Sequence, residues 1–166
     1  MTTDRLRKFT ITALMAALTC IATFMRVPAP LGYIHLGDAF VILSGITLGP
    51  IYGACAAGIG SLLPDLLGYP HFALATLLIK AITALVSSLI YRWFKKNISS
   101  VIAAGIVGGI IVTLGYFTFE YYILGLKAAA ISGIPLNGVQ NLFGIILSTL
   151  LYPLLIRVPQ IKNLTN

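Results

Sequence analysis

Most of the carboxylates of this chain lie in apolar stretches of the sequence, where burying a charge costs free energy. Three of its four acidic residues, Asp38, Asp65 and Glu120, fall within or at the edge of long apolar runs. A carboxylate in such surroundings usually persists only where it faces an opposite charge, a cavity or a substrate. These residues are therefore candidates for ligand contacts, for proton coupling or for structural ion pairs.

A second polar set follows helical spacing. Tyr116 and Glu120 are four residues apart, and Asn137, Gln140 and Asn141 share one helical face. A tyrosine ring can stack on a heteroaromatic ligand, amides can pair with its ring nitrogens and hydroxyls, and a carboxylate can accept from an amino or hydroxyl group. The set favours a small, polar heteroaromatic ligand.

The same residues also have structural interpretations. For Glu120 the alternative is a salt bridge with Lys80 or Lys127, and for Asn137 and Gln140 it is capping and hydrogen bonding of the last helix. Lys80 itself lies inside an apolar run. A lysine there needs a carboxylate or an anionic substrate group, so it stays a candidate for the site.

The remaining polar candidates are less distinctive. Asp38 follows Gly37 at the start of an apolar run, where it could cap a helix, and Asp65 near the end of another run is equally open to either role. His35 and His71 are expected in outer loops, more often as hydrogen-bonding surface residues than as ligand contacts.

Composition places these residues in a membrane. Hydrophobic residues make up 58% of the 166, charged residues only 9%, and the mean hydropathy is +0.99. Soluble domains carry about 25% charged residues. The chain could not cover a water-facing surface, so it is expected to be an all-α integral membrane protein.

Motifs for catalysis and for nucleotide binding are missing. The sequence has no H-E-x-x-H, G-x-S-x-G or G-x-x-x-x-G-K-[ST] pattern. Cys20 and Cys55 lie among apolar residues without a C-x-x-C context, which indicates core thiols and no metal site. We expect no enzyme activity, no cofactor and no nucleic-acid binding, although the net charge is +7.

Six apolar runs predict six transmembrane helices in a single domain that spans residues 1–166. A helix needs roughly 20 apolar residues to cross a bilayer. Two prolines and a glycine end the first run, Gly49-Pro50 signals a tight turn, and residues 132–138 are expected to form a break before the last run. The runs cover residues 9–26, 38–50, 51–68, 72–93, 100–125 and 138–157.

The basic residues orient this arrangement. With six spans, eight Lys and Arg fall on the side of the termini and two on the other side. Positive charge in short loops marks the cytoplasmic face, so both termini are predicted to be cytoplasmic and the polar candidates to lie toward the outside. The eight are Arg5, Arg7, Lys8, Arg92, Lys95, Lys96, Arg157 and Lys162, and the two are Arg26 and Lys127.

Several stretches together resemble one family of membrane proteins. They are Gly32–Phe40, Leu48–Ala54, Gly60–Leu67, Tyr116–Tyr121 and Pro135–Gln140. On these stretches the chain is similar to the substrate-binding S components of energy-coupling factor (ECF) vitamin transporters, closest to the branch that binds hydroxymethylpyrimidine or pyridoxine. The resemblance extends over nearly the whole chain.

The resemblance implies a multi-pass subunit of a prokaryotic cell membrane that captures a vitamin or its precursor from outside. It would work with a transmembrane T component and two cytoplasmic ATPases, which would hydrolyse ATP in its place. A small-residue face on the first helix would dock on the T component, and here Ala13, Ala16 and Ala17 match it. The whole subunit would topple to deliver the substrate, and a loop at residues 27–37 would close over it.

The predicted site combines both lines of reasoning. Glu120, Asn137 and Gln140 are expected to make polar contacts with the substrate, and Tyr116 and Tyr33 to stack on it or close the site. Two other functions remain open: a stand-alone proton-coupled secondary transporter, and a structural membrane subunit without a ligand. Further candidates for substrate contact are Lys80, His71 and Asp38.

Overall fold

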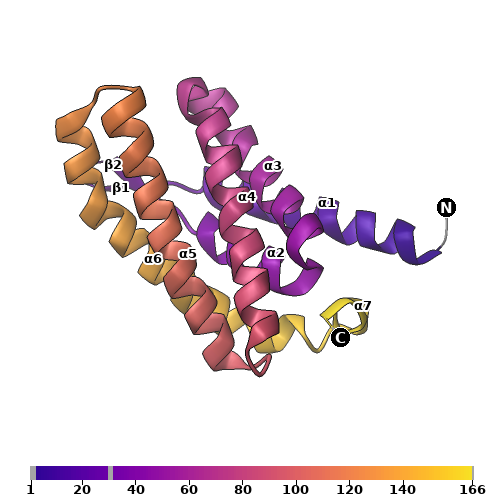
Figure 1. Cartoon of the computed structure of the whole chain (residues 1–166). Helices are drawn as coiled ribbons and strands as arrows, with labels where there is room; N and C mark the ends of the chain where they lie inside the picture. The colour runs from indigo at the N-terminus through magenta and orange to yellow at the C-terminus, as the bar shows by residue number, and fades with distance from the viewer. Residues whose placement is uncertain (1–2, 30–31, 166) are drawn as a thin grey trace.

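The computed structural model describes residues 3–29 and 32–165, and almost all of them are helical (Figure 1). This confirms the predicted all-α class. The elements in order are α1 (Thr3–Phe24), β1 (Val27–Ala29), β2 (Gly32–Ile34), α2 (Gly37–Leu48), α3 (Pro50–Gly68), α4 (Pro70–Trp93), α5 (Ile98–Thr118), the π-helical turn η1 (Phe119–Ile123), α6 (Lys127–Leu155) and α7 (Pro159–Thr165).

Five of the described helices, α1, α3, α4, α5 with η1, and α6, are long and apolar enough to cross a membrane. The expected sixth span, α2, has only 12 residues, and at 1.5 Å per residue it is about 18 Å long, well short of a roughly 30 Å hydrocarbon core. Every residue of α2 except Phe40 is buried. A helix that is apolar on all sides belongs in the core of a bundle, and α2 packs between α1, α3, α4 and α6.

The turn between α2 and α3 forms where the sequence indicates it. Gly49 has a positive φ of 84°, which glycine adopts without the steric penalty of a side chain, and Pro50 begins α3. A Cβ at Gly49 would also lie 2.6 Å from a guanidinium nitrogen of Arg92. The predicted tight turn is confirmed.

The predicted break at residues 132–138 is wrong. Helix α6 runs without interruption from Lys127 to Leu155 and contains Pro135. A proline removes one backbone hydrogen bond, which a membrane helix can tolerate when neighbouring groups compensate. The connection after α5 instead lies near Gly125, which has a φ of 70°. Because the helix starts earlier than expected, the residues around Gly133 face the interior of the bundle as part of α6.

The segment after α1 is more ordered than a proline-rich loop suggests. Strands β1 and β2 pair antiparallel, with Val27 opposite Ile34 and Pro28 opposite Tyr33. The sequence did not predict these strands. Strand β2 also contacts α6, so this hairpin connects the end of α1 with the last spanning helix.

Glycines let the helices approach closely. A Cβ at Gly45 of α2 would lie 2.1 Å from the carbonyl oxygen of Ala84 in α4, and one at Gly60 of α3 would lie 2.4 Å from that of Ala16 in α1. Small residues at such crossings are the common means of packing helices in lipid, where apolar burial gives little drive for association.

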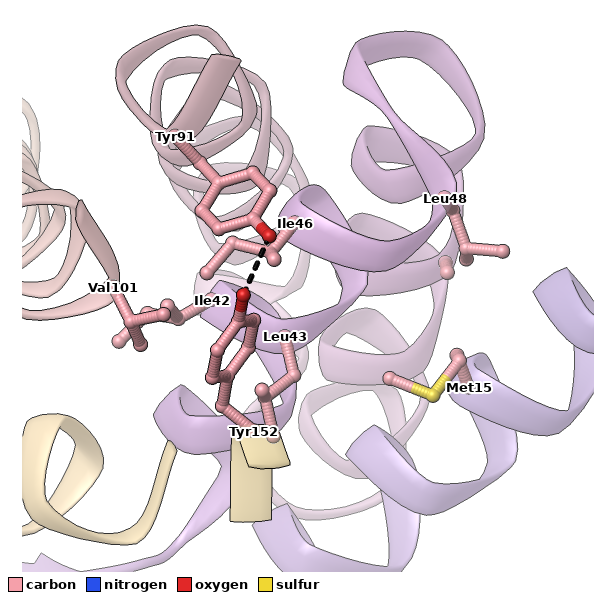
Figure 2. Close-up of a cluster of buried hydrophobic side chains, with 9 residues drawn as sticks. Met15, Ile42, Leu43, Ile46, Leu48, Tyr91, Val101 and Tyr152 are labelled. Carbon is pink, nitrogen blue, oxygen red and sulfur yellow. Dashed lines mark hydrogen bonds between the residues drawn. The ribbon is translucent and has the colours of Figure 1, made fainter. Parts of the chain in front are cut away.

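The largest apolar cluster surrounds α2 at the end of the bundle near the α4–α5 turn (Figure 2). Ile42, Leu43 and Ile46 of α2 pack there with Met15 and Val101. Within the cluster the hydroxyls of Tyr91 and Tyr152 are 2.7 Å apart, and Tyr152 donates to the carbonyl of Lys96 at 3.1 Å. This hydrogen-bonded core fixes one end of the bundle, and the polar residues gather toward the other.

Candidate functional site

A cavity of about 230 Å³ opens among α1, α3, α4, α5, η1 and α6. It lies at the end of the bundle where α3 joins α4 and where η1 leads into α6, away from the α4–α5 turn with its Lys95 and Lys96 (Figure 1). Five of the eight predicted substrate contacts line it: Lys80, Tyr116, Glu120, Asn137 and Gln140.

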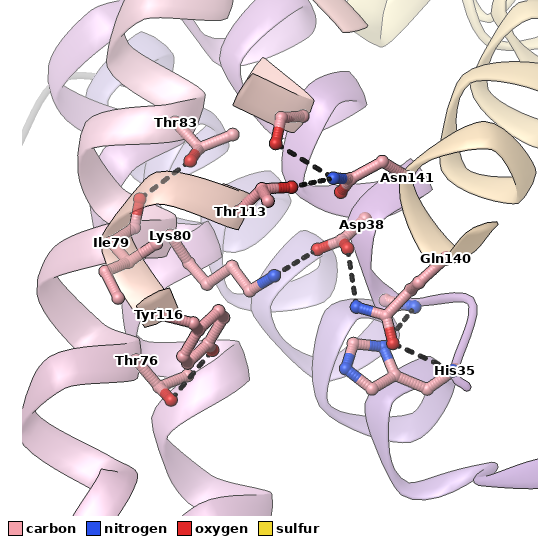
Figure 3. Close-up of polar contacts among 12 residues, drawn as sticks. His35, Asp38, Thr76, Ile79, Lys80, Thr83, Thr113, Tyr116, Gln140 and Asn141 are labelled. Atoms are coloured by element: carbon pink, nitrogen blue, oxygen red, sulfur yellow. Dashed lines mark hydrogen bonds and ion pairs between the residues drawn. The ribbon is translucent and has the colours of Figure 1, made fainter. Parts of the chain in front are cut away.

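A buried ion pair lies at the inner side of the cavity (Figure 3). Lys80 of α4 donates to one oxygen of Asp38 in α2, and the two residues are only 1% and 3% exposed. The other oxygen of Asp38 accepts from the Nε2 of Gln140 at 2.8 Å. The capping role considered for Asp38 is therefore wrong, because no side chain caps α2 and this carboxylate neutralises Lys80.

The network continues to the loop in front of α2. The backbone N–H of His35 donates to the Oε1 of Gln140 at 3.3 Å. Both ends of the Gln140 amide are thereby occupied by protein groups. Gln140 lines the cavity, and its two contacts hold the loop and the ion pair in place while one N–H and one oxygen lone pair of its amide remain.

His35 is buried, contrary to its expected place on the surface. It is 8% exposed, it lines the cavity, and its Nδ1 accepts from the N–H of Gly37 at 3.2 Å. Burial lowers the pKa of His35 to about 4 from 6.5, against the opposing effect of the Asp38 carboxylate. The imidazole is therefore neutral near pH 7, as the accepting Nδ1 requires.

A second network closes the side of the cavity near the end of α1. Arg26 pairs with one oxygen of Asp65 at 3.1 Å, and Thr76 donates to the other at 2.6 Å. The Thr76 hydroxyl also lies 2.9 Å from that of Tyr116. Asp65, whose role the sequence left open, thus links the segment after α1 with α3 and α4 and, through Thr76, with α5. Arg26, counted in the sequence only as a loop charge, also lies 5.0 Å from the centre of the Tyr69 ring.

Glu120 differs from the other two buried carboxylates. In the part of the chain that the structure describes, its carboxylate forms no ion pair and no hydrogen bond, although the residue is half-buried and lines the cavity. The alternative salt bridges are not formed, because Lys80 pairs with Asp38 and Lys127 lies over the ring of Tyr121 at 5.6 Å.

The neighbourhood of Glu120 leaves room for a ligand. A Cβ at Gly133 would lie 3.4 Å from a carboxylate oxygen of Glu120 and 3.9 Å from the amide nitrogen of Asn137. The Asn137 amide, like Glu120, makes no hydrogen bond with the residues at 3–29 and 32–165. A carboxylate and an amide therefore flank one glycine at the cavity wall, and both are available for hydrogen bonds.

Aromatic rings form another wall. Phe72 lies 6.3 Å from the ring of Tyr116 and 5.6 Å from that of Phe119, and the Lys80 ammonium is 5.3 Å from the centre of the Tyr116 ring. Tyr116 and Phe72 both line the cavity. Their faces offer apolar surface of the kind on which a heteroaromatic ring stacks.

Other predicted residues lie elsewhere. His71 is exposed, packs on Phe72 with ring centres 4.7 Å apart, and is not part of the cavity wall. Asn141 donates to the carbonyl of Gly109 at 2.8 Å and so joins α6 to α5. The backbone of Tyr33 lies in β2, while its side chain falls outside the described residues.

The predicted docking residues lie on two sides of α1. Ala13 and Ala17, four residues apart, are both exposed, whereas Ala16 is half-buried at the close approach of Gly60 in α3. The exposed small-residue face therefore comprises Ala13 and Ala17, and Ala16 serves the contact between α1 and α3.

The matches with known proteins include a family, a relative and a solved structure. The family model described as "ECF-type riboflavin transporter, S component" matches residues 4–157. A protein of Pyrococcus woesei, named "Uncharacterized protein in gap 3'region", is 35% identical over 136 residues, which cover 79% of this chain and 88% of that protein. A solved structure titled "Structure and mechanism of the S component of a bacterial ECF transporter" matches with a TM-score of 0.76 and 26% identity, over 92% of this chain and 97% of that one.

Proposed function

The chain belongs to the ECF-type riboflavin transporter S component family, whose members are substrate-binding membrane subunits, and we propose that it captures a small single-ring vitamin or vitamin precursor in this cavity. The observation that carries the proposal is the cavity itself, in which Glu120 and Asn137 have free hydrogen-bonding capacity beside an aromatic wall. Convergent polar groups on a mostly apolar concave surface are typical of small-molecule sites.

The size of the cavity favours one ring. Its volume of about 230 Å³ lies below the roughly 300–1,000 Å³ of pockets that hold drug-sized ligands. A pyrimidine or pyridine alcohol such as hydroxymethylpyrimidine or pyridoxine suits this space better than a three-ring flavin does. The word riboflavin in the name of the family model describes the family, and the branch to which this chain belongs remains our prediction.

The charges favour a neutral or cationic ligand. Lys80 is neutralised by Asp38 and Arg26 by Asp65, which leaves the carboxylate of Glu120 as the unbalanced charge on the described cavity wall. A phosphate ester would meet this carboxylate without a free cation to offset it. The proposed substrate is therefore the unphosphorylated alcohol, with an amino group or a protonated ring nitrogen near Glu120.

Each cavity residue then has a distinct part in binding. Glu120 accepts from the amino or ring N–H of the ligand, Asn137 pairs with a neighbouring ring atom, and Tyr116 with Phe72 covers a face of the ring. Gln140 and Asp38 act indirectly, because they hold Lys80 and the backbone of His35 in position.

The loop at residues 27–37 would control access. Two contacts hold it against the bundle, the Arg26–Asp65 ion pair and the hydrogen bond from His35 to Gln140. Opening this segment toward the outside would admit the substrate, and remaking the two contacts would retain it.

Delivery would require partners. We place both termini in the cytoplasm of a prokaryote and the cavity toward the outside, in line with the distribution of basic residues. A T component would dock on the face that carries Ala13 and Ala17, two ATPases would supply energy, and the subunit would topple to release its substrate. The chain shows no phosphate-binding loop that could serve ATP hydrolysis.

The competing proton-coupled mechanism finds less support in the site. It needs carboxylates that can bind and release protons, but Asp38 and Asp65 each hold a cation, which leaves Glu120 alone of the three for that role. Uptake of labelled hydroxymethylpyrimidine or pyridoxine by cells that make this chain, with and without a T component and the ATPases, tests the proposal. We expect uptake only with the partners, and uptake by the chain alone under a pH gradient would contradict it.

A further inference from the structure

Two buried hydroxyl groups at the cavity have no partner. Thr23 of α1 and Ser61 of α3 both line the cavity and are 3% and 1% exposed. Neither hydroxyl oxygen makes a hydrogen bond with a protein group in the described part of the chain. The sequence alone does not mark either hydroxyl as a ligand contact, since serine and threonine are common in membrane helices.

The neighbouring threonines satisfy their hydroxyls within their own helices. Thr19, one turn before Thr23, donates to the carbonyl of Met15 at 2.8 Å, and Thr83 of α4 donates to that of Ile79 at 2.8 Å. This bond to the carbonyl four residues earlier is available to any helical threonine. Thr23 does not form it.

An unpaired buried hydroxyl costs about 1–3 kcal/mol and is uncommon in native structures. Two of them at one cavity call for an explanation, and a ligand that bonds to both supplies one. The pair comes from α1 and α3, whereas Glu120 and Asn137 come from η1 and α6. The cavity wall thus carries two sets of polar groups from different elements.

We propose that Thr23 and Ser61 bind the alcohol group of the substrate while Glu120 binds its nitrogen end. The inference rests on the proposed function and adds a second point of recognition. A hydroxyl both donates and accepts, so the two side chains together match a neutral alcohol. They offer no charge to a phosphate, and the nearby Arg26 is already paired with Asp65, one turn after Ser61.

The test uses two probes that differ only at the alcohol, hydroxymethylpyrimidine and its analogue with methyl in place of hydroxymethyl. Affinities are measured by titration calorimetry on the purified full chain and on T23V and S61A. The matched controls are T149V and S88A, because Thr149 and Ser88 also carry unpartnered buried hydroxyls but do not line the cavity.

We expect each cavity variant to bind hydroxymethylpyrimidine about tenfold more weakly, the value of one hydrogen bond, and the methyl analogue within about twofold of the unaltered protein. The controls should bind both probes as the unaltered protein does. The thermal midpoint of the ligand-free variants should stay the same or rise, since an unsatisfied buried group has been removed.

Two results would overturn this inference alone. The first is an equal loss of affinity for both probes in T23V and S61A, which indicates lost packing. The second is an unchanged affinity of these variants for hydroxymethylpyrimidine. A lower midpoint with unchanged affinities would likewise show that the hydroxyls serve the fold. If the unaltered protein binds neither probe, hydroxymethylpyrimidine is not its substrate, and the alcohol site proposed for that compound fails with it.

Discussion

Replacing Lys80 by methionine tests whether Lys80 and Asp38 form a buried ion pair at the inner side of the cavity. Methionine keeps the length and apolar character of the stem but removes the ammonium. Lys80 is 1% exposed and Asp38 is 3% exposed, so the substitution leaves a carboxylate buried with only the amide of Gln140 beside it.

The expected loss is large. Removing one partner of a buried ion pair typically costs about 3–5 kcal/mol, because the remaining charge is buried without compensation. The double variant K80M/D38N should recover much of this loss, since asparagine is neutral and can still accept from Gln140. The free energy of unfolding of the double variant should exceed the value expected from adding the two single losses by about 1–3 kcal/mol.

Unfolding of the purified protein in mixed detergent micelles, followed by circular dichroism, measures these differences. The matched control is K127M, because Lys127 is exposed and its ammonium lies over the ring of Tyr121, a contact worth about 0.5–1 kcal/mol. A K80M protein within about 1 kcal/mol of the unaltered one, or a double variant no more stable than K80M, would refute the buried pair.

Three further predictions follow from the site. Glu120→Gln should weaken binding of a single-ring substrate by about ten- to a hundredfold without loss of folded protein, as expected for a charged hydrogen bond, and calorimetry on the folded variant checks it; unchanged affinity would remove Glu120 from the site. Burial lowers the pKa of His35 to about 4, so below pH 6.5 the unfolded chain takes up a proton that the folded protein does not. The free energy of unfolding should therefore fall by roughly 3 kcal/mol as the pH falls from 6.5 to 4. His35→Gln should flatten that part of the pH profile, and an equally steep profile in the variant would assign it to other groups. Ala13→Trp or Ala17→Trp should leave binding intact but abolish uptake with the partners, and weakened binding in the isolated protein would argue against a docking face.

The helices could be predicted because apolar runs and their breaks are local features. The turn at Gly49-Pro50 follows directly from residue types that favour it. The start of α6 could not be placed in the same way, because Pro135 and its neighbours resemble a loop in composition, and the helix persists through them.

The partners of the charged residues were not predictable from the sequence. In lipid, the outer and inner faces of a helix are both apolar, so the pattern does not reveal which helices meet. Lys80 was expected to pair with Glu120 if with any carboxylate, whereas packing of α2 in the centre of the bundle brings Asp38 to it. Because Lys80 pairs with Asp38, the Glu120 carboxylate at the cavity wall has no ion-pair partner among the described residues.

The same limit applies to Thr23, Ser61 and the buried His35. Each has an ordinary local sequence, and its significance depends on contacts with other elements that only the folded chain makes. Glu120, Asn137 and Tyr116, in contrast, could be selected early, because polar residues at helical spacing in apolar runs are rare enough to draw attention.

Thermal unfolding of the detergent-purified protein, with and without vitamins and precursors, tests the central claim most directly. A ligand at about 1,000 times its dissociation constant adds roughly 4 kcal/mol to the stability of the folded state. The account predicts a clear rise in midpoint with hydroxymethylpyrimidine or pyridoxine, no rise with the phosphate esters of these compounds, and a smaller rise in Glu120→Gln. Stabilisation by riboflavin alone, or by none of the compounds on folded and ligand-free protein, would contradict it.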